Sequence, residues 1–435
     1  MRIRIVTLFP EFFDSPLKAG LLGRAQETDT LKITLHNPRD NAHDRHKTVD
    51  DRPYGGGPGM VMLLEPLART LRELGHDGPE KGRKKRLLLM SPKGRPLTQG
   101  FARELAEDMA SGAPVTIVCG RYEGFDARLD EIFSVEHVSL GDFVLNGGET
   151  AALAVIESAA RLLPGFMGHE NSGDEESFSA SLLEYPHYTR PEIFEEHAVP
   201  EILRSGDHGK IAAWRRKESL LATAERRPDL FDNALISEDE ADFIRTVPRE
   251  DTSRNLFCAL VHYPVLDKAK KSVAVSLTNL DIHDIARCSC TYGLGGYYVT
   301  TPLEDQRNLL QSLLGHWQEG AGAKTNADRA EAFSLVKPAA SVEEAVNDIT
   351  ERTGRRPLLI GTSASGSGNV TFSGVREKLR NVPVLLVFGT GQGLSPYLCD
   401  TFDFMLPPLR RFGSYNHLSV RSAVAIMLDR ILGDW

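Results

Sequence analysis

The sequence lacks several patterns that define large classes of protein. No apolar run approaches the roughly 20 residues that a transmembrane helix needs. Its five cysteines include no Cys-x-x-Cys pair, and it contains no Gly-Lys-Ser/Thr phosphate loop. The apolar part of Met1–Pro10 is too short for a signal peptide and predicts a first strand instead. We therefore expect a cytoplasmic protein without membrane association, disulfides, structural zinc or a bound triphosphate.

An excess of positive charge is also missing. The formal net charge is −9, which taken alone argues against a nucleic-acid partner. Lysine and arginine nevertheless gather in three local clusters, at residues 39–52, 81–86 and 215–217. Contact with RNA would have to use these clusters, although each is also compatible with an ordinary solvated surface.

A length of 435 residues predicts two or three domains. Residues 1 to about 163 alternate strand-like and helix-like segments, which predicts an α/β domain with a mainly parallel sheet. A second α/β pattern begins at Leu256. The expected strands are 3–9, 31–36, 86–91, 115–119 and 135–139 in the first pattern, and 257–262, 273–277, 297–301, 357–360 and 384–388 in the second.

Helical and irregular segments separate the two patterns. An alanine-rich amphipathic helix is expected over 150–163, where Pro164 and Gly165 end it. The acidic stretch 168–178 has no periodicity and predicts a mobile loop or interdomain linker. Residues 209–226 and a capping box at Ser237–Glu240 predict a small helical domain. In the second pattern we expect helices near 280–290, 304–317, 342–353 and 418–432, a capping box at Ser341–Glu344 and an exposed loop at 320–326.

Two glycine-rich turns, Cys119–Gly124 and Leu140–Glu149, each follow a strand-like run. Both should lie at the carboxyl ends of neighbouring parallel strands, where α/β sheets bind ligands. Glycines allow the backbone to approach a ligand closely, and a third glycine-rich run, Tyr54–Met60, adds to them. Glycines in one turn alone would indicate only a tight turn. Together the three runs predict a pocket for an adenosine-type ligand.

The first part of the chain contains several long motifs in order: Leu8–Phe13, Asn37–Asp40, His43–Met60, Cys119–Gly124, Gly141–Glu149 and Pro186–Pro191. Together they closely resemble the bacterial tRNA (guanine-N1)-methyltransferase family, and the resemblance covers residues 1 to about 250. It implies methyl transfer from S-adenosylmethionine to N1 of the guanosine just 3′ of the anticodon, at tRNA position 37. It also implies a SPOUT-type fold with a trefoil knot, and a homodimer whose active sites lie at the subunit interface.

The chemistry requires a base, because guanine N1 carries a proton at neutral pH and is a poor nucleophile until that proton leaves. A cation is needed beside O6, where negative charge develops. Arg161 matches the family's arginine, although a cation at a helix C-terminus also has a purely structural use. The family's base is an aspartate just before Ser-Phe. Here Glu176 precedes Ser177-Phe178 and Asp174 lies two positions earlier, so Glu176 is the first candidate and Asp174 the alternative.

The resemblance also implies which residues hold the methyl donor. They are Ser91, Pro92, Gly120, Tyr122, Glu123, Leu140, Gly141, Asp142, Phe143, Val144, Leu145, Gly147 and Gly148. Phe143 stands where the family often has tyrosine, a change that backbone contacts should tolerate. The histidines and acids of 43–50 have neither zinc-finger spacing nor a helical His-x-x-x-His spacing, and in this family context they are expected to contact tRNA or order the dimer. Magnesium could assist catalysis in this family, but the sequence offers no ligand set for it.

The end of the chain contains three motifs in order, Val387–Ser395, Phe404–Leu409 and Tyr415–Ala423. Together they resemble the cofactor-binding end of another SPOUT branch, an RNA methyltransferase domain. The acidic residue usual in the first of these turns is absent, with Gly391 near its place. This half is therefore expected to be a second RNA methyltransferase of unknown substrate, or a cofactor-binding or dimerising module that has lost catalysis. Asn416 and His417 would line its pocket or cap a helix.

These observations predict four parts. They are a SPOUT domain at 1–165, a linker at 166–190, a helical tRNA-binding domain at 191–250 and a second SPOUT-like α/β domain at 256–435. The rival hypothesis is an RNA-binding or regulatory dimer that uses both SPOUT-like halves without catalysis. Substitution of Arg161 and of the carboxylates Glu176 and Asp174 distinguishes the two hypotheses, because only the enzyme needs these side chains for methyl transfer.

Overall fold

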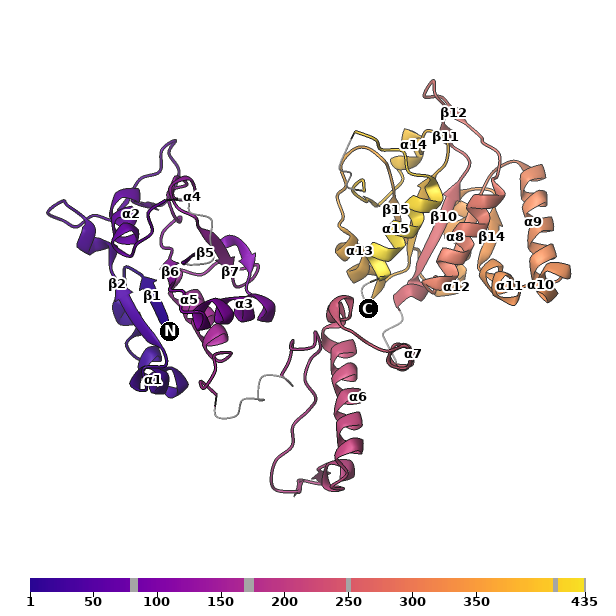
Figure 1. The fold of residues 1–435 in the computed structure, drawn as a ribbon. Coiled ribbons are helices and arrows are strands. Elements are labelled where there is room, and N and C mark those ends of the chain that lie inside the picture. The colour runs from indigo at the N-terminus through magenta and orange to yellow at the C-terminus, as the bar shows by residue number, and fades with distance from the viewer. Residues whose placement is uncertain (79–84, 168–175, 248–251, 410–413, 434–435) are drawn as a thin grey trace. The chain divides into compact units, whose positions relative to one another are not determined.

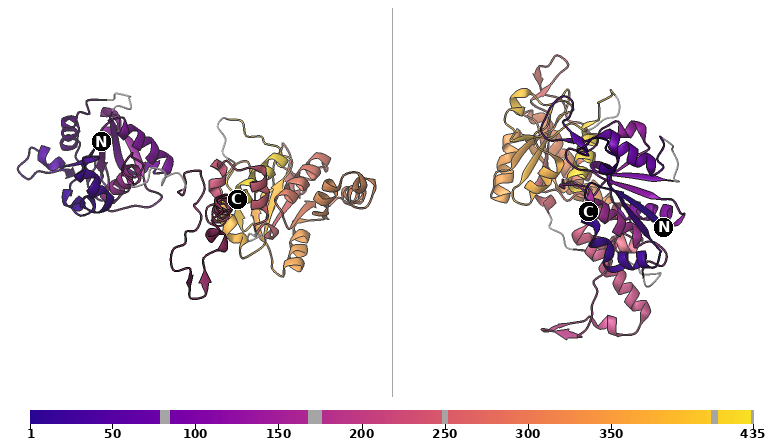
Figure 2. Two further views of the ribbon diagram at one scale, coloured as in Figure 1. Left: turned by 60° about the horizontal axis from the view of Figure 1, so that its bottom comes forward. Right: turned by 90° about the vertical axis from the view of Figure 1, so that its left-hand side faces the viewer.

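The computed structural model describes residues 1–78, 85–167, 176–247, 252–409 and 414–433. Contacts within the chain divide it into two units, Met1–Ser219 and Leu220–Trp435 (Figure 1). Each unit contains a parallel sheet with helices on both faces (Figure 2). The α/β class with two parallel sheets is confirmed, whereas the knot and the four domain boundaries stay predictions.

A five-stranded sheet in the order β2-β1-β6-β5-β7 forms the centre of the first unit, and its strands are parallel. Side chains alternate between its faces. Leu88 and Met90 pack with α1, α3 and α5, whereas Leu87 and Leu89 pack with α2 and α4. The elements are β1 (Arg2–Val6), α1 (Gly20–Glu27), β2 (Lys32–His36), α2 (Leu64–Glu73), β5 (Arg86–Pro96), α3 (Gln99–Ala110), β6 (Val115–Cys119), α4 (Leu129–Ile132), β7 (Glu136–Ser139) and α5 (Glu149–Ala160).

Strand β5 is longer than the sequence predicts because it bends and pairs with β7 a second time. Met90 lies beside Val138, and after the bend Arg95 lies beside the same residue. Gly94 makes the bend possible, since a Cβ there would stand 2.3 Å from the backbone nitrogen of Val138.

Smaller elements complete the first unit and lead into the second. Two short hairpins join β3 (Asp50–Asp51) to β4 (Val61–Met62), and β8 (Ile193–Phe194) to β9 (His197–Ala198). The predicted helices of the central region are confirmed as α6 (His208–Arg226) and α7 (Glu238–Arg245). Ser237 and Glu240 form the predicted capping box of α7.

The second unit contains a sheet in the order β14-β13-β10-β16-β15-β17, again with parallel pairing. Alternate residues of its central strand β10 pack against α12 on one face and against α8, α11 and α15 on the other. The elements are β10 (Leu256–Val261), β11 (Val265–Leu266), β12 (Ser272–Val273), α8 (Asn279–Thr291), β13 (Gly296–Thr300), α9 (Glu304–Gln318), α10 (Ala321–Thr325), α11 (Ala327–Ser334), β14 (Val336–Ala339), α12 (Val342–Thr353), β15 (Leu358–Gly361), α13 (Phe372–Leu379), β16 (Val384–Gly389), α14 (Pro396–Cys399), β17 (Phe404–Met405) and α15 (Val420–Leu432).

Three predictions for the second unit are wrong in part. The expected strand 273–277 survives only as the end of the hairpin β11–β12. The expected loop at 320–326 contains the short helix α10, which packs against α9. At Ser341 only half of the capping box forms, because Glu344 accepts the backbone N–H of Ala340 rather than that of Ser341.

Among the residues that the structure describes, every helix is too short or too polar to cross a bilayer.

Candidate functional site

The two glycine turns of the first unit lie against each other, as the sequence predicts. The backbone N–H of Gly148 donates to the carbonyl of Gly120 at 2.8 Å. A Cβ at Gly148 would stand 2.7 Å from the nitrogen of Gly120 and 2.8 Å from the Cα of Cys119. Glycine is therefore needed at position 148 for the turns to touch.

A cavity of about 480 Å³ opens over these turns. That volume lies within the range of small-molecule sites. Of the residues expected to hold the methyl donor, all line this cavity except Gly141 and Asp142. Gly141 instead shapes the turn, with a φ of 153° and a carbonyl that accepts the N–H of Phe143 at 2.9 Å, and Asp142 is exposed. Lining residues that the sequence analysis missed include Lys93, Arg121, Phe125, Asp126, Asp130, His137, Asn146 and Ala151.

Arg121 and Glu149 connect the two turns through an ion pair. Arg121 Nη2 lies 2.8 Å from Glu149 Oε2, and the guanidinium packs on the ring of Phe9 at 4.3 Å. Glu149 Oε1 also accepts the hydroxyl of Thr7 at 2.8 Å. With only 2% of its side chain exposed, Glu149 joins both turns to the end of β1 from within the core. No sequence signal distinguished this structural carboxylate from a ligand-binding one.

The third glycine run reaches the same site. The N–H of Glu123 donates to the carbonyl of Met60 at 2.9 Å, and a Cβ on Gly59 would collide with the side chain of Glu123. Tyr122 holds a left-handed backbone conformation with a φ of 58°. Burial, followed by a hydrogen bond with Asp50, raises the pKa of its phenol. The motif around Asp50 is thereby placed beside the turns, and such backbone strain in a non-glycine residue is common at functional sites.

The guanidinium of Arg161 meets the carboxylate of Glu176, the first candidate for the base. Arg161 Nη2 donates to Glu176 Oε1 at 2.5 Å. Their side chains are 42% and 23% exposed, so the pair is accessible from solvent. Arg161 is also the C-cap residue of α5, where its charge suits the helix dipole. Asp174, the alternative base, and most of the acidic stretch lie outside the described residues.

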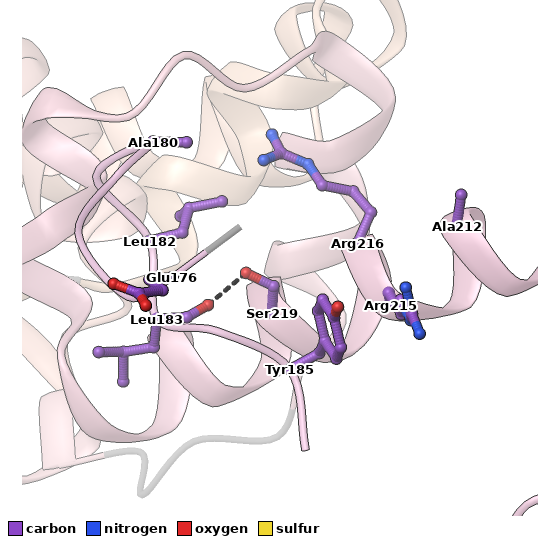
Figure 3. Close-up of a pocket in the computed structure, with 9 residues that line it drawn as sticks. All are labelled: Glu176, Ala180, Leu182, Leu183, Tyr185, Ala212, Arg215, Arg216 and Ser219. Atoms are coloured by element: carbon purple, nitrogen blue, oxygen red, sulfur yellow. Dashed lines mark hydrogen bonds between the residues drawn. The ribbon is translucent and has the colours of Figure 1, made fainter. Parts of the chain in front are cut away.

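Glu176 lines a second, smaller cavity of about 240 Å³ between residues 180–185 and α6 (Figure 3). Two arginines of α6, Arg215 and Arg216, line it as well. The guanidinium of Arg215 lies 4.7 Å from the ring centre of Tyr185, and Ser219 donates to the carbonyl of Leu183. One of the three basic clusters predicted from the sequence therefore borders the candidate base.

The cavity over the glycine turns and the Arg161–Glu176 pair lie at opposite ends of α5. The helix begins at Glu149, inside the second turn, and ends at Ala160. Twelve helical residues extend about 18 Å at 1.5 Å per residue. Within the described part of the chain, no residue lines both cavities.

The second unit contains a turn of the same shape. Gly391 and Gly393 have φ values of 61° and 103°, against 58° and 112° for Tyr122 and Gly124. In each turn the residue between these two positions donates its N–H to a carbonyl of a preceding hairpin. Glu123 donates to Met60, and Gln392 donates to Leu266. Gln392 therefore occupies the place of Glu123, and Gly391 is the residue next to it.

A cavity of about 870 Å³ lies at this second turn. Asn416 and His417 both line it, as one alternative predicted. The other alternative, a helix cap, is wrong because Ser419 caps α15 by accepting the N–H of Ser422 at 3.3 Å.

No group of three or more potential metal ligands occurs among the described residues.

Comparison with known proteins agrees with these geometric observations. Residues 1–233 match the model of the family described as tRNA (Guanine-1)-methyltransferase TrmD, and residues 255–433 match that of a family described as SAM-dependent RNA methyltransferase. Both resemblances predicted from the sequence are confirmed.

Individual relatives divide into two kinds. Two full-length relatives come from Oleidesulfovibrio alaskensis and Nitratidesulfovibrio vulgaris, and both are named tRNA (guanine-N(1)-)-methyltransferase. Each is 60% identical to this chain over 434 residues, and the match covers 100% of this chain and 100% of the relative. A protein of the same name from Rhodopseudomonas palustris is 51% identical over 230 residues, which make up 53% of this chain and 88% of that protein. The chain belongs to the tRNA (guanine-1)-methyltransferase family and has a second half that matches an RNA methyltransferase family.

Proposed function

We propose that the first half of the chain transfers a methyl group from S-adenosylmethionine to N1 of guanosine 37 in tRNA. The observation that carries this proposal is the Arg161–Glu176 contact, because it joins a cation and a carboxylate at solvent-accessible positions. A regulatory dimer without catalysis would not need that pair. The comparisons with known proteins do not favour such a dimer either.

The roles of the pair follow from the chemistry of guanine. Glu176 accepts the N1 proton, which makes N1 a nucleophile. Arg161 donates to O6 and stabilises the charge that builds there. S-Adenosylmethionine supplies a methyl group activated by its sulfonium, and the turns around Gly120 and Gly148 have room for close backbone contacts to it. Glu176 is longer by one methylene than the family's aspartate, and its contact with Arg161 indicates that the longer side chain still reaches the arginine.

The 18 Å length of α5 argues that two chains build each active site. Reacting atoms must come within about 3–3.5 Å of each other. Arg161 lies at the far end of α5 from the donor cavity of its own chain. We therefore propose a homodimer in which Arg161 and Glu176 of one chain serve the donor cavity of the other. The exposed side chains of Phe143, Val144 and Leu145 at the cavity rim are available for that contact.

The tRNA contacts are proposed for basic residues near the pair and the donor cavity. Arginine forms bidentate contacts to phosphate, so Arg215 and Arg216 of α6 are suited to the anticodon stem-loop backbone beside Glu176. Residues 39–52 lie beside Tyr122, which supports a similar role there. Cytoplasmic location follows from the location of tRNA and is proposed on that ground.

For the second half, we propose methyl transfer to RNA, supported by its family match and by the cavity at the Gly389–Gly393 turn.

Unmodified tRNA transcripts with G37 or A37 test the first proposal. After incubation with the full chain and S-adenosylmethionine, nucleoside mass spectrometry should find N1-methylguanosine only in the G37 transcript. Equal methylation of both transcripts, or none of either, would overturn it.

A further inference from the structure

The cavity of the second unit contains its own carboxylate–guanidinium pair. Asp281, in the first turn of α8, accepts a hydrogen bond from Arg421 Nη1 at 3.0 Å. Both residues line the cavity beside the Gly389–Gly393 turn. The side chain of Asp281 is 13% exposed and that of Arg421 is 37% exposed, so the pair is held at the wall while the guanidinium remains reachable.

The position of Arg421 is electrostatically unfavourable for the helix that carries it. Arg421 is the second residue of α15, where the positive end of the helix dipole repels a cation. Two carboxylates of α8 offset this repulsion, since Arg421 Nε also lies 3.4 Å from Asp284 Oδ2. Asp284 is 47% exposed and does not line the cavity. Asp284 alone would be enough to anchor the guanidinium of Arg421. Asp281 also contacts this guanidinium, and in addition it presents a carboxylate to the cavity.

The turn beside this pair repeats the geometry of the first unit but lacks its acid. Gln392 replaces Glu123 at the equivalent place, so Asp281 supplies a carboxylate that this turn does not. In the first unit the carboxylate–arginine pair lies at the far end of a helix from the donor cavity. In the second unit the pair lines the cavity of its own chain.

We propose that Asp281 and Arg421 form the acceptor site of a second methyltransferase centre, and that its substrate is an RNA base with a lactam group, guanine or a uracil-type base. This inference rests on the proposed role of residues 256–435 as an RNA methyltransferase. A lactam presents an N–H donor beside a C=O acceptor, which complements a carboxylate acceptor beside a guanidinium donor. Loss of the N–H proton creates an anion, and Arg421 stabilises it. Exocyclic amines of adenine and cytosine form no such anion before they react.

The reaction balances with groups already named. Asp281 takes the ring N–H proton, and the freed electron pair of the nitrogen forms a bond to the methyl carbon of S-adenosylmethionine. The carbon–sulfur bond breaks, and its electron pair remains on sulfur as S-adenosylhomocysteine is released. The proton is then lost from Asp281 to solvent.

The test uses the full chain carrying Arg161→Ala, so that the first centre is silent. It is incubated with S-adenosylmethionine labelled in the methyl group and with transcribed, unmodified tRNA and ribosomal RNA, and the RNA is then digested to nucleosides. Label is expected in a ring-N-methylated guanosine or uridine. Adding Asp281→Asn should lower the rate by about a hundredfold or more, whereas Asp284→Asn should change it by less than about threefold, as expected of a surface pair.

Each contrary outcome is distinct. Label in 2′-O-methyl nucleosides, adenosine or cytidine would overturn the substrate class, and no label in any RNA would overturn the second centre. Equal effects of Asp281→Asn and Asp284→Asn would reduce Asp281 to an anchor of Arg421. Thermal unfolding of both variants shows whether α8 and α15 still pack. Failure of the first centre is seen separately, because nuclease fragments of G37 transcripts treated with the unsubstituted chain would then carry no N1-methylguanosine at position 37.

Discussion

Arg121 and Glu149 form an ion pair of 2.8 Å that joins the two glycine turns. Arg121→Met would leave the Glu149 carboxylate buried without its charge partner. We expect this substitution to lower the free energy of unfolding by about 3–5 kcal/mol, the usual cost of breaking a buried pair. Denaturant titration of both proteins measures the difference.

Arg128→Met provides the matched control for that experiment. Arg128 also pairs with a carboxylate, Asp126, at 2.6 Å, but its side chain is 59% exposed. Its removal should cost less than about 1 kcal/mol. Equal losses in the two variants would show that burial of Glu149 does not set the strength of the Arg121 contact.

Neutral substitutions at Glu176 and at Asp174, made one at a time, distinguish the two candidate bases. Glu176→Gln preserves shape and hydrogen bonding but cannot accept a proton, so kcat for methylation of G37 should fall by about 10²–10⁴. Asp174→Asn should leave kcat within about threefold of the unsubstituted chain if Glu176 is the base. Single-turnover kinetics with saturating S-adenosylmethionine measures both. A larger loss from Asp174→Asn would assign the base to Asp174.

We expect His262 to make the stability of the second unit sensitive to acid. His262 is 1% exposed, and burial lowers the pKa of its imidazole to about 4 from an ordinary 6.5, against smaller opposing effects of the Leu260 backbone and of the charge of Asp281. The folded state binds the imidazole proton more weakly than the unfolded state does. The free energy of unfolding is therefore undiminished by His262 above pH 6.5, and it falls as the pH is lowered from 6.5 toward 4. The gap between the two pKa values corresponds to about 3 kcal/mol.

His262→Leu removes this titration. Unfolding monitored by calorimetry between pH 7 and pH 4 should show a steeper loss of stability in the unsubstituted chain than in the variant. Parallel stability curves would mean that His262 is not neutral in the folded state.

Hydrophobic periodicity predicted most strands of the two large sheets, and the glycine turns predicted where the first cavity lies. Strands and turns could be predicted because each depends on local sequence. Strand β14 was missed because Pro338 normally excludes a strand. It is tolerated here since β14 lies at the edge of the sheet. Helix α10 was predicted as a loop because its sequence is rich in glycine and alanine. A Cβ on Gly322 would stand 2.6 Å from the ring of Trp317, so glycine allows the helix to pack closely there.

The roles of individual charged residues depended on tertiary contacts that no local pattern contains. Arg121 and Glu149 stand 28 positions apart, and Asp281 and Arg421 stand 140 apart. Arg161 and Glu176 could be singled out only through a family resemblance. Their mutual contact, and their separation along α5 from the cavity over the glycine turns, required the structure.

A mixed dimer tests the proposed division of the active site most directly. One chain carries Arg161→Ala and the other Gly148→Ala, whose Cβ would force the turns apart. Calorimetry should first confirm that Gly148→Ala abolishes donor binding while the chain still dimerises. Each homodimer should be inactive toward G37 transcripts. With two different affinity tags the heterodimer can be purified, and it should contain one intact site and recover about half of the activity of the unsubstituted dimer. An inactive heterodimer would contradict the assignment of Arg161 and the donor cavity to different chains.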